Sequence, residues 1–141
     1  MTIPFYQLFF LKDKLLKKEI MGRYYSGSIR GKFWFGLQSS SAADRFGVFG
    51  SYLDDNSLEY HFKENHLGKV NDEIKMIETH LGEKKKTLDV FFENNMLYNS
   101  DDILKLGVTN DEFKDYADLL LGYKIRDCII QNGFCSFEAE L

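Results

Sequence analysis

The spacing of apolar residues changes along the chain, from a period of two to a helical period and back to two. Between Arg23 and Gln38, aromatic and β-branched residues form two short runs separated by glycine and serine, which is typical of strands. The pattern predicts a hairpin with strands over Arg23–Ile29 and Lys32–Gln38 and a turn at Arg30-Gly31. A third strand is predicted over Ser57–Phe62, where large apolar residues alternate with polar ones.

From His66 onward, apolar residues recur every three or four positions, as on one face of an amphipathic helix. This spacing predicts a helix from His66 to Leu81, an interruption at Gly82 and a second helix over Glu83–Asn94. A short helix over Ser100–Leu106 and a long one over Asn110–Asn132 follow the next break in the pattern.

The last helix carries boundary signals at both ends. Thr109 and Glu112 have the spacing of a capping box, and Gly133 is the residue type that commonly ends a helix. Phe134–Leu141 then alternates again and predicts a half-exposed strand. The predicted fold is therefore α+β: a small antiparallel sheet, made of the aromatic hairpin and the C-terminal strand, covered on one face by three helices.

The loop after the hairpin is rich in serine, glycine and phenylalanine. The serine run at Ser39–Ser41 leads into Ala-Ala-Asp-Arg-Phe, which predicts one short helical turn. Phe46 and Phe49 stand among glycines, and both rings are predicted to lie beneath this loop.

Residues 1–20 are predicted to be an amphipathic N-terminal extension of a single domain over residues 21–141. Leu8, Leu11 and Leu15 fall on one helical face, and lysines follow them. The apolar run is too short to span a bilayer, and its charges come after it, the reverse of a signal peptide. Such a segment packs on its own body, docks a partner or lies on a membrane, and we favour packing.

Composition adds three points to this picture. The chain has 44% hydrophobic and 28% charged residues, as in ordinary soluble domains, but 16% of its residues are aromatic. Cys128 and Cys135 match no zinc spacing and are predicted to be reduced core thiols, which indicates a reducing, cytoplasmic setting. No residue pattern predicts a metal site or a cofactor.

Charge is unevenly distributed. The first 32 residues carry a net charge of +5. Because the whole chain has a net charge of −4, the remaining residues carry −9. A basic arm can contact nucleic acid or membrane, or can dock on its own acidic body, which we favour. Ile103–Thr109 resembles the turn of a helix-turn-helix, but the surface of the following helix is predicted to present mainly carboxylates, including Asp111, Glu112, Asp115 and Asp118. DNA binding is disfavoured because phosphates require the opposite charge.

The outward face of the predicted sheet holds the candidate site. If the predicted strands share one sheet, seven side chains project from one side: Lys32, Trp34, Gln38, Glu59, His61, Glu138 and Glu140. An aromatic plane beside a cation, an amide and carboxylates can bind a small polar ligand such as a nucleotide. In the competing interpretation, Glu138 and Glu140 are solvated partners of Lys32, and Trp34 lies under the N-terminal helix.

Catalytic signals are sparse. His66 and His80 fall at the ends of a surface helix, and Ser39–Ser41 lacks the glycine setting of a nucleophile elbow. We therefore predict no catalytic residues and a non-enzymatic binding protein. The alternative is a small hydrolase that uses Glu138, Glu140 and His61.

Several strings of the chain suggest a resemblance. They are Gly22-Arg-Tyr-Tyr-Ser-Gly27, Gly31-Lys-Phe-Trp-Phe-Gly36, Gln38-Ser-Ser40, Asp44 with Phe46-Gly47, and Cys135-Ser-Phe-Glu-Ala-Glu-Leu141. In these, the chain from Met21 resembles short uncharacterised proteins of large DNA viruses, phages and metagenomes. The resemblance implies a virus-related accessory protein that binds a partner protein or small ligand in the host cytoplasm. A virion-associated structural protein that docks through residues 1–20, and a homo-oligomer, remain open.

Overall fold

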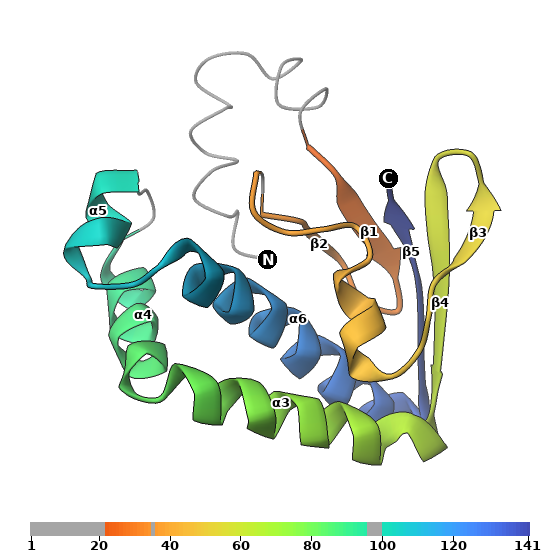
Figure 1. Ribbon diagram of the computed structural model, residues 1–141. Coiled ribbons are helices and arrows are strands. Elements are labelled where there is room, and N and C mark those ends of the chain that lie inside the picture. The colour runs from red at the N-terminus through yellow and green to blue at the C-terminus, as the bar shows by residue number, and fades with distance from the viewer. Residues whose placement is uncertain (1–21, 35, 96–99) are drawn as a thin grey trace.

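The computed structural model describes residues 22–34, 36–95 and 100–141. Within these ranges, five strands form one antiparallel sheet, and the helices lie on one side of it (Figure 1). The strands are β1 (Tyr24–Gly27), β2 (Gly31–Lys32), β3 (Ser51–Asp54), β4 (Ser57–Lys63) and β5 (Phe134–Glu140). The helices are η1 (Ala42–Phe46) and η2 (Glu64–His66), both 3₁₀, and α3 (Leu67–Leu81), α4 (Glu83–Asn94), α5 (Ser100–Lys105) and α6 (Asn110–Asn132).

The C-terminal strand lies at the centre of the sheet. The strand order is β2-β1-β5-β4-β3, so β5 pairs with the N-terminal hairpin on one side and with β4 on the other. In this register, Glu138 lies opposite Ser26 of β1 and opposite Glu59 of β4. The predicted α+β fold, with its hairpin and C-terminal strand in one antiparallel sheet, is confirmed.

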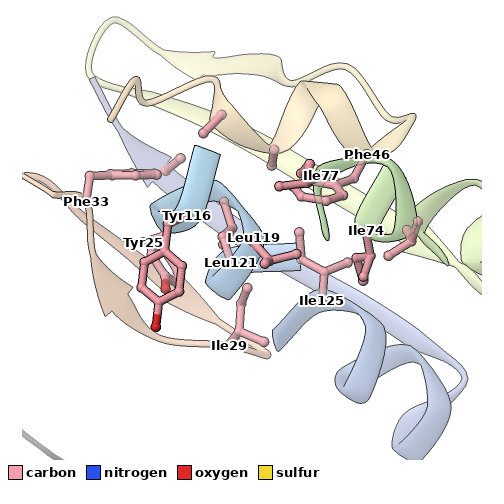
Figure 2. Close-up of a cluster of buried hydrophobic side chains, with 14 of the residues drawn as sticks. Tyr25, Ile29, Phe33, Phe46, Ile74, Ile77, Tyr116, Leu119, Leu121 and Ile125 are labelled. Atoms are coloured by element: carbon pink, nitrogen blue, oxygen red, sulfur yellow. The ribbon is translucent and has the colours of Figure 1, made fainter. Parts of the chain in front are cut away.

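The sheet turns one face toward the helices. Tyr60, Phe62 and Phe137 are almost completely buried on this face, and the rings of Tyr60 and Phe137 stack with centroids 5.1 Å apart. Helix α6 packs directly on β4 and β5, and α3 runs along α6. Figure 2 shows side chains of β1, η1 and α3 gathered around α6 residues in this core.

One glycine allows a close approach of a ring to α6 in this core. Gly122 lies in α6, and a Cβ built on it would lie 2.5 Å from the ring of Phe46. The Phe46 ring is completely buried, as predicted. Phe49 is 79% exposed, so the prediction that its ring lies beneath the loop is wrong.

The helix boundaries confirm the local signals in the sequence. Thr109 Oγ accepts a hydrogen bond from the Glu112 amide at 3.1 Å, and the Glu112 carboxylate accepts one from the Thr109 amide at 2.9 Å. Gly133 ends α6 in a left-handed conformation, with φ of 81°. The predicted helical turn is present as η1.

The second strand of the predicted hairpin is wrong beyond Lys32. Only Gly31 and Lys32 pair with β1, and the chain then turns toward the helices. The amides of Leu37 and Gln38 both donate to the carbonyl of Trp34, at 3.1 and 2.9 Å, which closes a tight turn. The sequence also gave no indication of β3.

The predicted extension over residues 1–20 lies outside the described residues. In the part of the chain that is described, no helix combines the length and apolar character required to cross a bilayer. Both cysteines are free and buried, as expected for core thiols. Burial raises the pKa of the Cys135 thiol, and its contact with Cys128 raises it further.

Candidate functional site

The face of the sheet opposite the helices presents four of the seven predicted site residues to solvent. Because side chains alternate along a strand, burying Tyr60 and Phe137 directs their neighbours outward. Glu59 and His61 of β4, and Glu138 and Glu140 of β5, therefore lie together on what we call the outer face. The prediction that these four share one side of the sheet is confirmed.

Three carboxylates are adjacent on the outer face. Glu59 is the direct cross-strand partner of Glu138, and Glu140 lies two residues further along β5, about 7 Å away. The Glu140 carboxylate accepts a hydrogen bond from the Tyr24 amide at 2.7 Å, which fixes it at the β1 border. The result is a concentrated negative charge across two central strands.

His61 links two neighbours on this face. Its Nε2 lies 3.1 Å from Glu59 Oε1, and its Nδ1 lies 2.9 Å from Ser136 Oγ on β5. The hydroxyl thus contacts the imidazole, and the imidazole contacts the carboxylate, which is the arrangement used in nucleophilic catalysis. The imidazole and carboxylate are solvent-exposed on a sheet surface, whereas catalytic groups work in a water-excluding cavity.

A polar hollow lies beside the carboxylates, with a volume of about 370 Å³. It is lined by Gly22, Arg23, Ser26, Asn56, Ser57, Glu138, Glu140 and Leu141. His61 does not belong to this lining, so this hollow does not bring Glu138, Glu140 and His61 together. The acid–base set required by the hydrolase alternative is therefore not assembled here.

Trp34 does not lie on the outer face, which corrects the prediction. Its indole packs edge-on against Phe92 of α4 and against Phe113 and Tyr116 of α6, with centroid distances of 5.5, 5.1 and 6.2 Å. The turn after Lys32 carries the ring to the helical side, where aromatic edge-to-face packing is available.

Gln38 is also turned away from the outer face. The side chain is buried, and its amide donates to Asp118 Oδ1 at 3.0 Å while its carbonyl accepts from the Trp34 amide at 3.2 Å. Lys32 pairs with Tyr24, and this register places it on the same side of the sheet as Glu138, but it is buried, with its ammonium 5.5 Å from the ring centroid of Tyr24. The seven residues therefore do not form one exposed site.

The prediction that Asp118 lies on the surface of the last helix is wrong. Asp118 is completely buried in α6 and accepts hydrogen bonds from Arg45 Nη1 at 2.7 Å and Lys114 Nζ at 3.0 Å, besides that from Gln38. Burial lowers the pKa of Arg45, but hydrogen bonds with Asp118, Asp115 and Glu73 raise it by more, so the net shift is upward. This network, which we call the Asp118 cluster, has its donors and acceptors paired with one another and joins η1, α3 and α6.

Arg23, the residue directly before β1, extends the same network. Its two terminal nitrogens donate to Ser40 Oγ and to the backbone carbonyl of Gln38, each at 2.5 Å. The burial of Asp118 had one signal in the sequence. In the helical register, Asp118 falls beside the buried positions Ala117 and Leu121. We interpret the Asp118 cluster as a structural lock and the outer face as the candidate site.

The fold and the outer face define a small α+β protein with an acidic sheet surface. Among the described residues, no group of three or more His, Cys, Asp or Glu side chains is arranged to hold a metal ion. Comparison with protein-family models, curated proteins and solved structures found no match. The resemblance to viral and phage proteins stays a prediction.

Proposed function

We propose that the protein is a non-catalytic binding module whose outer face holds a basic, extended segment of a partner protein. The observation that carries the proposal is the adjacency of Glu59, Glu138 and Glu140 on the two central strands. Three carboxylates within one patch attract lysine and arginine side chains and repel phosphates. A cationic peptide therefore fits this face better than a nucleotide or DNA.

The direct pairing of Glu59 with Glu138 supports a role in binding. Like charges opposite each other in a ladder are destabilising, on the order of 0.2–1 kcal/mol. His61 contacts Glu59 but offsets its charge only when protonated. A bound lysine or arginine would reduce the repulsion between Glu59 and Glu138, which makes the free energy of binding more favourable.

The ends of β5 add apolar contacts. Phe134, the first residue of β5, and Leu141, which directly follows it, are large exposed hydrophobic residues, and the strand spans roughly 20–24 Å. A segment of about seven extended residues matches that length, with basic residues at its centre and apolar residues at its ends. In the setting implied by the resemblance, such a module acts as an accessory protein in the host cytoplasm.

The test is a binding titration with a defined probe. A fluorescent peptide of about seven residues, Leu-Ser-Lys-Ser-Lys-Ser-Leu, in which the leucines and lysines share one side of an extended chain, is titrated with the full chain and followed by anisotropy. We expect Glu59→Gln with Glu138→Gln to weaken binding about fivefold or more at low salt. We also expect binding by the unmodified protein to weaken as salt shortens the screening length.

A matched double variant controls for net charge. Glu83→Gln with Glu93→Gln removes the same charge from the exposed surface of α4 and should leave binding unchanged. Equal weakening by both double variants would show that only overall charge matters. Equal binding of a peptide with serine in place of every lysine would also contradict the proposal.

A further inference from the structure

The strand β3 is the last strand of the sheet on its side. Among the described residues, β3 pairs with β4 and with no strand beyond it, and Figure 1 shows it as the outermost strand at that end. A register shift between Tyr52 and Asp54 limits the regular edge to Ser51–Leu53. The outward backbone groups of an edge strand can pair with another strand.

This edge carries large apolar side chains and no charge. Phe49 and Tyr52 are each 79% exposed and Leu53 is 46% exposed, and no charged residue occurs from Phe46 to Leu53. Natural edge strands are commonly protected by lysine, by proline or by an inward-pointing charge. Ser51–Leu53 has none of these, although the register shift shortens the edge.

We propose that β3 pairs antiparallel with β3 of a second copy of this chain, about a two-fold axis close to Tyr52. Two-fold pairing brings the same surface together from both copies, and an antiparallel edge offers its backbone groups to an identical edge. The two five-stranded sheets then join into one continuous sheet. This surface lies apart from the carboxylates of the proposed function and does not depend on them.

The edge is self-complementary, which identifies a second copy as the occupant. In antiparallel pairing about Tyr52, Ser51 of one copy faces Leu53 of the other, and the two Tyr52 residues face each other at the axis. Because no residue from Phe46 to Leu53 is charged, no like charges meet along this paired edge.

The exposed area indicates a weak dimer. From their exposed fractions, Phe49, Tyr52 and Leu53 present on the order of 400 Å² per copy. Two copies with their backbone edges bury about 1,000 Å², at the lower limit for a specific interface. We expect a concentration-dependent dimer with Kd on the order of 10–100 μM.

The first experiment is sedimentation velocity of the full chain over about 5 to 500 μM, a range that spans the expected Kd. We expect Tyr52→Lys to raise the dimer Kd about tenfold or more, because two ammonium groups then meet at the axis. Met76→Lys is the matched control, since Met76 is 53% exposed on α3 and should leave the Kd unchanged. Circular dichroism verifies that both variants are folded.

The second measurement locates the interface. Amide hydrogen exchange at about 5 and 500 μM should show slower exchange at Tyr52 or Leu53 in the concentrated sample. A chain that stays monomeric over the whole range overturns the proposal. So does a dimer that Tyr52→Lys leaves intact, or one in which exchange at β3 is the same at both concentrations.

Discussion

The Gln38 side chain donates a hydrogen bond to Asp118 Oδ1 at 3.0 Å, across 80 positions of sequence and inside the protein. This bond holds the turn after β2 against α6. Because Gln38 is fixed there, the turn that begins at Trp34 faces the helices, and the indole packs on Phe113. The buried contact between the Gln38 amide and the Asp118 carboxylate thus lies where the chain leaves the sheet after Lys32.

We expect Asp118→Ala to be strongly destabilising. The substitution leaves the half-buried Arg45 without its shortest partner and the Gln38 amide without an acceptor, at a cost of about 3 kcal/mol. Urea unfolding followed by circular dichroism measures the free energy of unfolding. Asp72→Asn, on the exposed surface of α3, should change it by less than about 0.5 kcal/mol. Similar losses for both variants would show that the buried cluster does not stabilise the fold.

Two glycine-to-alanine substitutions should have opposite effects. Alanine is the better helix former by about 1 kcal/mol, but at Gly122 its Cβ would lie 2.5 Å from the Phe46 ring. We expect Gly122→Ala to lower stability by about 1–3 kcal/mol.

Gly68 provides the matched comparison, because nothing lies within 4 Å of a Cβ at that position in α3. We expect Gly68→Ala to be neutral or to stabilise by up to about 1 kcal/mol. Thermal unfolding of both variants checks the pair. A stabilising Gly122→Ala would mean that Phe46 does not pack closely on α6.

The capping box at the start of α6 should give a pH-dependent contribution to stability. The hydrogen bond from the Thr109 amide, and then that from Lys84, lower the pKa of Glu112 below its usual value of 4.5. A lowered folded-state pKa stabilises the fold above the unfolded pKa, and this contribution is lost as pH falls through the folded value.

The stability difference between the unmodified protein and Glu112→Gln should therefore be present at pH 7 and smaller at about pH 3. Urea unfolding at the two pH values measures it. Asp111→Asn, one position earlier in the same helical turn, controls for a general effect of acidic residues near the helix start. An equal difference for Glu112→Gln at both pH values would contradict this account.

The structure also changes which residues deserve functional tests. Trp34 and Gln38 are held by internal contacts, so substituting them would test folding more than binding. The four outer-face residues Glu59, His61, Glu138 and Glu140 remain as the candidate site. Their grouping was predictable because strand alternation is local, and β4 and β5 both alternate clearly.

The sequence alone determined the features that depend on neighbours within a few positions. The capping box at Thr109 and Glu112, the helix end at Gly133 and the alternation of β5 all result from local hydrogen bonds and a fixed side-chain period. The α+β fold class follows from the order of these elements. These signals required no knowledge of distant contacts.

Tertiary structure decided the rest. Asp118 is buried because Arg45 arrives from η1, 73 positions away, and local spacing contains no information about such a partner. Strand β3 is exposed at every residue, so it has no burial alternation for a pattern to reveal. Trp34 has the spacing of a strand residue, but aromatic contacts with α4 and α6 draw it to the other side, because packing at a distance outweighs a weak local preference.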